Sequence, residues 1–472
     1  MHIHLIAIGG TGMAPLACLL QSQGHRVTGS DGPLYPPMST LLGEAGIEPL
    51  VGFDPAHLEP RPDLVVVGNA VRRDNVEAVR AEELALPRLS MPEAMARFFL
   101  ADRRPLVVAG THGKTTTTAM AAWAYAACGR APGYLIGGLP LDLPGSFAHG
   151  AGERFVIEGD EYNAAYFDRG AKFLHYRPET VLLTSLEHDH ADLYPDFASL
   201  RVAFARLIAL LPPSGRLVAC GDSAAVRELA GEARCPVIFY GLTPGNEVGL
   251  AAPPEFGDAG LRLLVADRQA GTVEVTLPIW GRHNATNALG VWAAARADGI
   301  SAPELAAALG RFHGVKRRQE VVGEVGGIVV VDDFAHHPTA VGCTLEALRE
   351  RFPGRRLVAM FEPRSLTAGR AMLREAYFEA FCRADETLFA PLFHRDRLAP
   401  DERLDLPGLV ADLVASGHPA RACESFDQLL EAALAGARAG DVLVTMSSGS
   451  FGQLPRRLLA GLEERRDQVV HP

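Results

Sequence analysis

The stretch from Val107 to Thr117 constrains the fold most, because it predicts a strand, a glycine turn and the start of a helix in direct succession. Backbone N–H groups in such a turn point at an anion, a lysine adds a positive charge, and a following threonine can hold Mg²⁺. The full eight-residue P-loop pattern is not met, since Val108 stands at its first glycine. The strand–turn–helix context still predicts a nucleoside triphosphate site in an α/β sheet. Its candidate residues are Gly110, Thr111, His112, Gly113, Lys114, Thr115 and Thr116.

Length and composition favour a multidomain globular protein. The 472 residues suggest about three domains at roughly 150 residues each. Hydrophobic residues make up 48 % and charged residues 21 %, and the net charge of −11 argues against a general nucleic-acid binder. Seven scattered cysteines without a Cys-x-x-Cys pair indicate reduced thiols. With no basic leader and no apolar run near the ~18 residues of a membrane span, we expect a cytoplasmic protein that binds neither nucleic acid nor membrane.

The first predicted domain, residues 1–103, begins like a dinucleotide-binding unit. A strand Ile3–Ile8, a glycine turn, a helix Ala14–Gln23 and a strand Arg26–Gly29 follow one another. The strict Gly-x-Gly-x-x-Gly fingerprint fails, with Ala7 and Pro15 at positions where a glycine could stand. Three uses stay open: a nicotinamide site, a turn that only packs the helix on the sheet, or a site for the nucleotide diphosphate of a substrate. The candidate residues are Gly9, Gly10, Thr11, Gly12, Met13, Ser30 and Asp31.

The second predicted domain, residues 104–318, begins after a polar, proline-marked joint and brings acids and histidines to strand ends. Strand-like runs end in Glu158-Gly159-Asp160-Glu161 and in the segment 187–192. Carboxyl ends of parallel strands share one edge, so we expect both segments to converge on the glycine turn. Thr115, Glu158 and His190 are the candidate ligands of Mg²⁺, which prefers oxygen donors and takes imidazole less typically. The other acids are expected outside the ligand set or in solvent: Asp160, Glu161, Glu187 and Asp192.

The third predicted domain, residues 319–472, again alternates strands with helices, which predicts a parallel sheet. Its expected elements are strands Ile328–Val331, Leu357–Phe361 and Val442–Met446 and a helix Thr339–Arg351. Just before it, Arg317 and Arg318 form either a solvated basic turn or a source of a guanidinium group for a γ-phosphate across the joint.

These motifs resemble, in order from about residue 3 to residue 452, those of the Mur ligases, the ATP-dependent amide-forming enzymes of peptidoglycan metabolism. The segments at 110–115, 158–161 and 189–192 resemble the family's ATP loop, acidic metal motif and metal histidine motif. The resemblance implies catalytic roles for Lys114, His190 and Arg318, with Arg318 on the γ-phosphate. It also implies adenine contacts from Asn284 and Asn287 and a ribose contact from Asp333.

The resemblance also narrows the substrates. Family members that act on peptide-bearing substrates often have a carbamoylated lysine about fifteen residues after the metal histidine, where this chain has Phe204-Ala205-Arg206. That departure implies the branch that uses UDP-N-acetylmuramate itself. Segments 29–40, 68–70, 361–365 and 446–452 resemble members that recycle a tripeptide. Members that add L-alanine usually have a Gln-Pro-His-Arg-type segment where this chain has Glu362-Pro363-Arg364-Ser365.

The implied reaction is ATP- and Mg²⁺-dependent and serves peptidoglycan recycling. UDP-N-acetylmuramate is phosphorylated on its muramyl carboxylate, and the amine of L-alanyl-γ-D-glutamyl-meso-diaminopimelate then displaces phosphate; L-alanine is the alternative amine. The first implied domain is Rossmann-like and binds the UDP-sugar, the second is of the P-loop ATPase type and binds ATP, and the third is Rossmann-like and binds the peptide and part of ATP. The resemblance also implies a monomer or weak homodimer. His188 and His336 are candidate bases. Further implied substrate contacts are Asn69, His336, Arg364 and Ser365.

Two competing classes explain only part of the chain. A nicotinamide oxidoreductase accounts for the first domain and leaves the glycine–lysine turn unused, while a P-loop kinase or ATP-driven switch accounts for the second domain alone. Two departures from the family pattern concern local geometry: Ala7 replaces a usual glycine, and Gln319 stands where an apolar residue is common.

Overall fold

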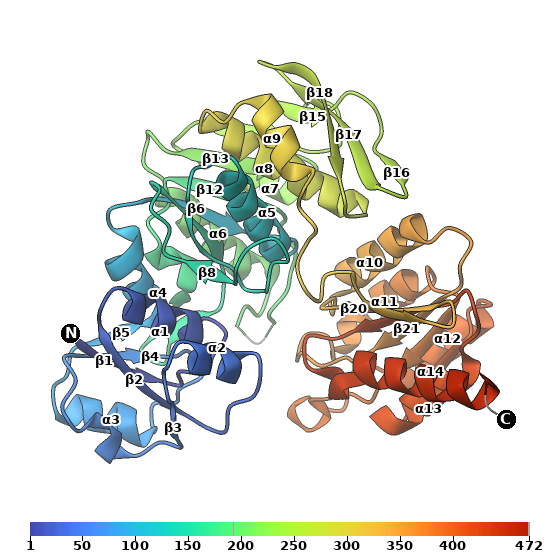
Figure 1. The fold of residues 1–472 in the computed structure, drawn as a ribbon, viewed down its shortest axis with the longest axis horizontal. Helices are drawn as coiled ribbons and strands as arrows, with labels where there is room; N and C mark the ends of the chain where they lie inside the picture. The colour runs from blue at the N-terminus through green and yellow to red at the C-terminus, as the bar shows by residue number, and fades with distance from the viewer. Residues whose placement is uncertain (192, 471–472) are drawn as a thin grey trace.

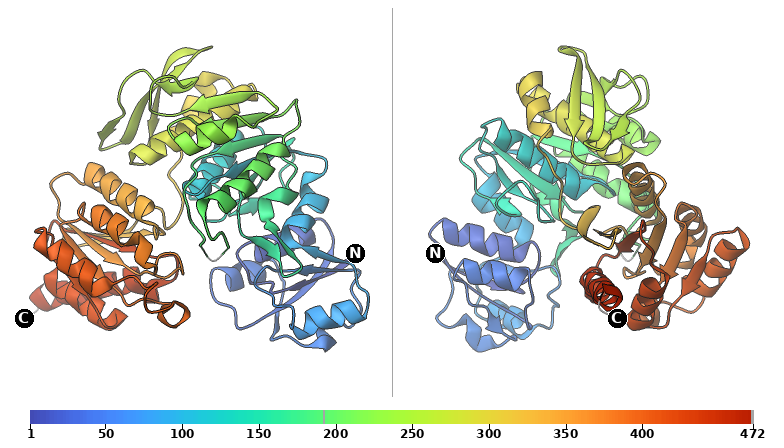
Figure 2. Two further views of the ribbon diagram at one scale, coloured as in Figure 1. Left: turned by 180° about the vertical axis from the view of Figure 1, so that it is seen from behind. Right: turned by 45° about the vertical axis from the view of Figure 1, so that its right-hand side comes forward.

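The computed structural model describes residues 1–191 and 193–470, which fold into three α/β units in chain order (Figure 1). Figure 2 shows the same arrangement from two other sides. The sheets use residues 2–90, 104–277 and 320–446, and within the described ranges no strand is shared between them. The α/β fold class with three units is confirmed, whereas the domain boundaries stay predictions. No helix among the described residues is both long and apolar enough to cross a bilayer.

The first unit is a parallel sheet in the order β3-β2-β1-β4-β5. Its central strand ends at Ile6, because Ala7 adopts a φ of +64° and starts the glycine turn two residues earlier than expected. The turn therefore lies at the middle of the carboxyl edge. The strands are β1 (His2–Ile6), β2 (Arg26–Asp31), β3 (Leu50–Val51), β4 (Leu64–Val67) and β5 (Arg88–Ser90). The helices are α1 (Met13–Ser22), α2 (Met38–Glu44), α3 (Val76–Glu83) and α4 (Met91–Met95).

The second unit has an eleven-stranded sheet whose centre is parallel. Strand β6 (Arg104–Ala109) pairs with β9 (Arg154–Gly159) on one side and with β12 (Thr180–Leu183) on the other. The three strand ends that carry the glycine turn and the two acid and histidine segments are therefore neighbours, as the sequence predicts. Helices α5 (Lys114–Ala127) and α8 (Arg282–Ala297) pack against each other beside this edge.

One end of this sheet was not anticipated from the sequence: β15, β16, β17 and β18 pair antiparallel beyond β14. The remaining strands of the unit are β7 (Gly133–Leu135), β8 (Phe147–Ala148), β13 (Arg216–Cys220), β14 (Val237–Tyr240), β15 (Val248–Leu250), β16 (Glu255–Gly257), β17 (Gly260–Asp267) and β18 (Gly271–Leu277). A separate hairpin joins β10 (Asn163–Ala165) and β11 (Asp168–Ala171). The remaining helices are α6 (Phe197–Ala209), α7 (Ala224–Ala230) and α9 (Ala302–Leu309).

The third unit has a sheet in the order β19-β20-β24-β21-β22-β23, parallel except at β19. The strands are β19 (Glu320–Val325), β20 (Ile328–Asp333), β21 (Leu357–Phe361), β22 (Glu386–Phe389), β23 (Ala420–Ala422) and β24 (Val442–Met446). The helices are α10 (Pro338–Arg351), α11 (Arg374–Phe381), α12 (Leu406–Ala415), α13 (Phe426–Gly436) and α14 (Leu454–Val470). Short helices η1–η6 complete the chain at Pro55–Leu58, Ala96–Leu100, Lys172–His175, Ala371–Leu373, Arg395–Arg397 and Phe451–Gln453.

A buried ion cluster fastens the edge of the second sheet opposite the glycine turn. Asp298, the C-cap of α8, accepts hydrogen bonds from Arg154 at the start of β9, from Arg216 at the start of β13 and from Tyr125 in α5. The Asp298 and Arg154 side chains are only 7 % and 5 % exposed. Burial alone would raise the pKa of Asp298, but Arg154, Tyr125 and Arg216 together lower it.

We expect Asp298→Ala to lower the free energy of unfolding of this unit by about 3–5 kcal/mol, because two guanidinium groups lose their buried partner. Since the folded pKa of Asp298 lies below its unfolded value, this stabilisation is present above about pH 4 and is lost as the pH falls toward the folded pKa. All three tryptophans, at 123, 280 and 292, lie in the second unit, so urea titration followed by tryptophan fluorescence measures it. The exposed Asp258→Ala is the control; an equal effect of both changes would contradict the prediction.

Candidate active site

The turn after β6 folds the Lys114 side chain back over its own backbone. The Nζ atom donates to the carbonyl oxygens of Gly110 at 2.5 Å and Thr111 at 3.2 Å and to Oε1 of Glu161 at 3.0 Å. Burial of the ammonium group lowers its pKa, but the nearby carboxylates, Glu161 first, outweigh that and raise the pKa of Lys114. The turn therefore holds a permanent cation at the sheet edge, where a phosphate group needs one.

Gly113 shows why this turn requires glycine. It has a φ of +81°, caps α5 without a side-chain hydrogen bond, and lies so close to α8 that an added Cβ would stand 2.8 Å from Oδ1 of Asn287. Asn287 donates to Asn284 at 3.2 Å, and Asn284 donates to the Trp280 carbonyl at 2.7 Å. The asparagine pair predicted to contact adenine is thus packed against the turn predicted to hold the phosphates.

We expect Gly113→Ala to weaken ATP binding at least tenfold, because the methyl group must displace the turn or Asn287. Positive φ alone costs an alanine about 1 kcal/mol. Gly129→Ala is the matched control, since Gly129 has a φ of +71° but open space where its Cβ would stand. Calorimetric titration with ATP measures both variants; equal losses of affinity would mean that backbone strain, not the collision, is responsible.

The three predicted metal ligands belong to two pairs of contacting residues, Thr115 with Glu158 and His190 with Glu161. Oγ1 of Thr115 donates to Oε1 of Glu158 at 2.9 Å, while Nε2 of His190 lies 3.0 Å from Oε1 of Glu161. Lys114 connects the pairs, since both carboxylates raise its pKa. Burial raises the pKa of Glu158, and hydrogen bonds from the Gly137 N–H and Thr115 oppose it. A hydroxyl group, a carboxylate and an imidazole beside further carboxylate oxygens form a donor set that fits Mg²⁺.

Glu161 has a larger role than the sequence suggested. Of the two expectations for it, a solvated acid or an acid outside the ligand set, the first is wrong: the residue is 1 % exposed and contacts both Lys114 and His190. Its Oε2 atom is buried and has no hydrogen-bond partner among the described residues. A buried unpaired carboxylate oxygen is costly, and a bound cation would satisfy it.

The other acids of the two segments differ in their surroundings. Asp160 pairs with Lys172 at 2.9 Å, so it is also not simply solvated. Glu187 accepts from His112 at 3.0 Å and from Thr339 of the third unit at 2.8 Å. Asp192 lies outside the described residues.

The adjacent arginines at the joint serve different units. Nη2 of Arg318 donates to Oγ1 of Thr115 at 3.3 Å, which places this guanidinium group at the predicted nucleotide site. Arg317 instead contacts the third unit: it donates to Asp332 at 3.1 Å and to the carbonyl oxygens of Ser447 and Gly449 at 2.8 and 2.6 Å. The solvated-turn alternative is therefore wrong for both residues.

Around the joint, Asp333 is 4 % exposed and accepts from the N–H groups of Gln319 and Ala335, both at 2.7 Å; burial raises its pKa. Gln319, the departure from the family pattern, is buried and contacts His283 at 3.1 Å. The joint thus packs through polar contacts where an apolar residue is common, and the ribose role of Asp333 stays a prediction.

In the first unit the glycine turn is close-packed. The Gly9 N–H donates to Asp31 at 2.8 Å, and a Cβ on Gly9 would stand 2.1 Å from Cδ2 of Leu34. The Ser30 hydroxyl is buried and donates to Glu77, so it faces the core instead of the turn. A substrate contact from the Ser30 side chain is therefore not supported. The rest of the predicted turn, Gly10, Thr11, Gly12 and Met13, leads directly into α1.

Asn69 lines a cavity of about 820 Å³ between the first and second units. Three arginines and one acid, Asp74, share it, with Asp74 paired to Arg72 at 3.1 Å. The excess of positive charge suits an anionic ligand such as a diphosphate. The residues around Asn69 that line this cavity include Arg72, Arg73, Asn163, Tyr166 and Arg169.

The predicted peptide residues follow strand ends of the third unit. Arg364 lies over the Phe393 ring at 4.0 Å and donates to Glu362 at 3.4 Å, with its side chain 30 % exposed. Ser365 accepts from the Ala368 N–H at 3.0 Å. Thr367 accepts from the Ala191 N–H of the second unit at 3.3 Å, so this loop reaches the histidine segment.

The two candidate bases differ. Nε2 of His188 lies 2.9 Å from the Tyr194 carbonyl, whereas Nδ1 of His336 lies 3.1 Å from the Phe334 carbonyl. Burial lowers the pKa of His336, and Asp189 opposes the shift. Asp189, near His336 and His190, is buried, but these histidines hold its pKa at about 2.

Comparison with known proteins agrees with this geometry. The chain matches the Mur ligase family, catalytic domain, over residues 2–103, the Mur ligase middle domain over 108–295, and the Mur ligase, glutamate ligase domain, over 317–449. It is 39 % identical to the UDP-N-acetylmuramate--L-alanyl-gamma-D-glutamyl-meso-2,6-diaminoheptandioate ligase of Escherichia coli, covering 99 % of both chains. It is 34 % identical to the UDP-N-acetylmuramate--L-alanine ligase of Rubrobacter xylanophilus, covering 98 % of this chain and 100 % of that one.

A solved structure gives the same result. The crystal structure of a murein peptide ligase from Psychrobacter arcticus superimposes with a TM-score of 0.73 at 34 % identity, covering 98 % of each chain. Full-length similarity of this kind, together with a lysine turn, an acidic motif and a histidine motif at one sheet edge, leaves one assignment: this chain belongs to the Mur ligase family.

Proposed function

We propose that this chain joins UDP-N-acetylmuramate to L-alanyl-γ-D-glutamyl-meso-diaminopimelate at the expense of ATP, in peptidoglycan recycling. The observation that carries the proposal is the end-to-end similarity to the Escherichia coli ligase of that name, at 39 % identity. The sequence segments that favour a tripeptide over L-alanine support it. The first glycine turn and the arginine-lined cavity at Asn69 would take the UDP-sugar, and no nicotinamide site is needed to explain them.

The main physical obstacle is the approach of two anions, the muramyl carboxylate and the γ-phosphate. Two unit charges at 4 Å repel by roughly 4 kcal/mol at an effective dielectric constant near 20. The ammonium group of Lys114 lies over the glycine turn, and the guanidinium group of Arg318 donates to Thr115, the residue after Lys114. Both cationic groups would offset this repulsion. Thr115, Glu158 and His190 would hold Mg²⁺, which supplies further charge neutralisation when bound.

Two bond changes complete the reaction. The γ-phosphoryl group passes from ATP to the muramyl carboxylate, which gives ADP and an acyl phosphate. The tripeptide amine then attacks the carbonyl carbon through a tetrahedral intermediate, phosphate leaves, and the amine loses a proton. An α-amine has a pKa near ~8, so part of it is already neutral at pH 7. His336, whose lowered pKa keeps its imidazole neutral, is suited to accept the proton.

We expect Arg364→Ala to raise the KM for the tripeptide about tenfold or more and to change kcat less, because its guanidinium group is a partly exposed cation on the loop that reaches the histidine segment. Initial rates of phosphate release over a range of tripeptide concentrations measure this. Arg421→Ala, an exposed arginine on β23 of the same unit, is the control. An unchanged KM in the Arg364 variant would show that another group binds the peptide.

A specific observation keeps L-alanine as the second candidate amine: relatives named for it reach 34 % identity over nearly the whole chain. Phosphate release from ATP and Mg²⁺ with UDP-N-acetylmuramate separates the two. Turnover with the tripeptide and none with L-alanine is the expected result. Turnover with L-alanine alone would move the function to the biosynthetic reaction, and tight NADH binding without UDP-sugar binding would contradict the substrate assigned to the first unit.

A further inference from the structure

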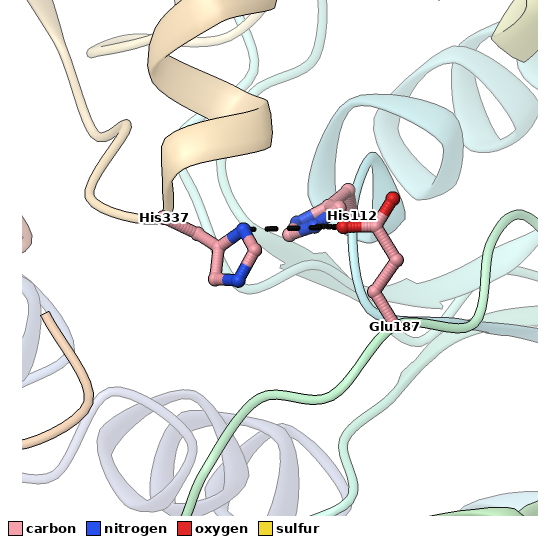
Figure 3. A group of neighbouring side chains, drawn as sticks. All are labelled: His112, Glu187 and His337. Carbon is pink, nitrogen blue, oxygen red and sulfur yellow. Dashed lines mark hydrogen bonds and ion pairs between the residues drawn. The ribbon is translucent and has the colours of Figure 1, made fainter. Parts of the chain in front are cut away.

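Two histidines and one carboxylate from three separate segments meet outside the predicted Mg²⁺ site. Figure 3 shows His112 on the turn before α5, Glu187 on the loop after β12, and His337 immediately before α10 of the third unit. Nε2 of His112 lies 3.0 Å and Nδ1 of His337 lies 4.0 Å from the same oxygen, Oε2 of Glu187. Among the described residues, this is the one group of three histidine, cysteine or acidic side chains whose ligand atoms all lie within 4.8 Å of one another.

His337 gives a second, independent indication of a ligand. Its side chain is 10 % exposed, and its Nδ1 atom is buried without a hydrogen-bond partner among the described residues. Although His337 is the N-cap of α10, its ring makes no capping hydrogen bond, and Pro338 follows it. A buried imidazole nitrogen aimed at a carboxylate beyond hydrogen-bond distance is an unsatisfied polar group that an ion between the two would satisfy.

We propose that His112, Glu187 and His337 form a binding site for a transition-metal ion of the Zn²⁺ class, separate from the Mg²⁺ site at Thr115, Glu158 and His190. Two imidazole nitrogens with a single carboxylate oxygen suit Zn²⁺ and related ions, whereas Mg²⁺ prefers a set dominated by oxygen donors. Three protein ligands leave a fourth position for water.

The geometry requires only small side-chain movements. Ligands at about 2.1 Å from a tetrahedral ion lie roughly 3.4 Å apart, between the 3.0 and 4.0 Å contacts to Glu187. The Glu187 carboxylate is 42 % exposed, which gives an ion a path from solvent. Burial, with a smaller contribution from His112, lowers the pKa of His337 to about 4, so its imidazole is neutral and free to coordinate at pH 7.

The site would link two units of the enzyme. His112 belongs to the turn that holds Lys114, and His337 begins the first helix of the third unit; Thr339 in that helix already donates to Glu187 at 2.8 Å. An ion bound here fixes the third unit against the nucleotide turn.

The binding test uses the full chain with Co²⁺ as a spectroscopic probe and Zn²⁺ as its competitor, in millimolar Mg²⁺. We expect one equivalent of Co²⁺ to give visible d–d absorption bands that Zn²⁺ abolishes. His337→Gln should weaken Zn²⁺ binding at least about tenfold. The matched control is His313→Gln, because Nδ1 of His313 pairs with Asp142 at 2.6 Å but has no second imidazole in the described cluster.

Two further variants keep the result decisive. Thr339→Val removes the hydroxyl group that positions Glu187 and should also weaken Zn²⁺ binding, which tests the site if His337→Gln fails to fold by circular dichroism. Glu158→Gln disrupts the Mg²⁺ site and should leave Zn²⁺ binding unchanged. Unchanged Zn²⁺ affinity in folded His337→Gln, or loss of Zn²⁺ binding in Glu158→Gln alone, would overturn the proposal. Since the readout is metal binding, neither outcome depends on the proposed ligase reaction.

Discussion

Lys114→Ala is expected to reduce ATP-dependent phosphate release by about a thousandfold or more, which corresponds to roughly 4 kcal/mol of transition-state stabilisation. The ammonium group is the cation of the nucleotide turn, and it also neutralises Glu161, which lies beside His190. Without it, the buried carboxylates would face the incoming phosphate with one protein cation fewer. Steady-state phosphate release at saturating substrates measures the loss.

The control for this variant is Lys316→Ala, one of the other two lysines of the chain, which is exposed and lies near the joint. It should retain nearly full activity. Because Lys114 is itself buried against Glu161, circular dichroism must show that the Lys114 variant is folded before its activity is compared. Full turnover in a folded Lys114→Ala enzyme would mean that the turn does not bind the transferred phosphate.

Arg318→Ala is expected to lower kcat about a hundredfold to a thousandfold, since removal of one group that stabilises developing charge has an effect of this size. Arg317→Ala is the matched comparison and should keep most of the kcat. It should lower the thermal stability of the third unit, because it removes hydrogen bonds to Ser447 and Gly449. Rates and melting curves of the two single variants test this together.

The contrast between these arginines is the strongest check on the site. Both carry the same charge and stand one residue apart, so a change in overall electrostatics would affect both variants alike. Equal losses of kcat would mean that the joint acts through its packing and that the contact of Arg318 with Thr115 has no separate catalytic role.

Parallel-strand cores could be predicted from sequence with some accuracy. The runs Leu357–Phe361 and Val442–Met446 are the observed β21 and β24, and the helix expected at Thr339–Arg351 begins one residue earlier, at Pro338. Buried parallel strands are continuous apolar runs with sharp ends, which explains this agreement. The antiparallel strands β15–β18 were missed, because β15 and β16 have three residues each and because β17 and β18 mix buried and exposed positions instead of forming one continuous apolar run.

Side-chain partners could be predicted less well than positions. The pattern places Glu158, Asp160 and Glu161 equally at a strand end, but the backbone turn after Gly159 decides which carboxylate is buried under Lys114. Ser30 pairs with Ile6 at the strand end that leads into the turn, yet its hydroxyl donates to Glu77, more than forty residues away. The group of His112, Glu187 and His337 could not be seen either, because its members come from two domains whose relative placement no local pattern encodes.

The contacts of Arg317 and Arg318 bear on when ATP can transfer its γ-phosphoryl group. One guanidinium group is anchored in the third unit, while the next one along the chain reaches Thr115 in the second. A movement of the third unit that withdrew Arg318 would leave ATP bound to the glycine turn without this second cationic group. Transfer of the phosphoryl group would then wait until the second and third units come together.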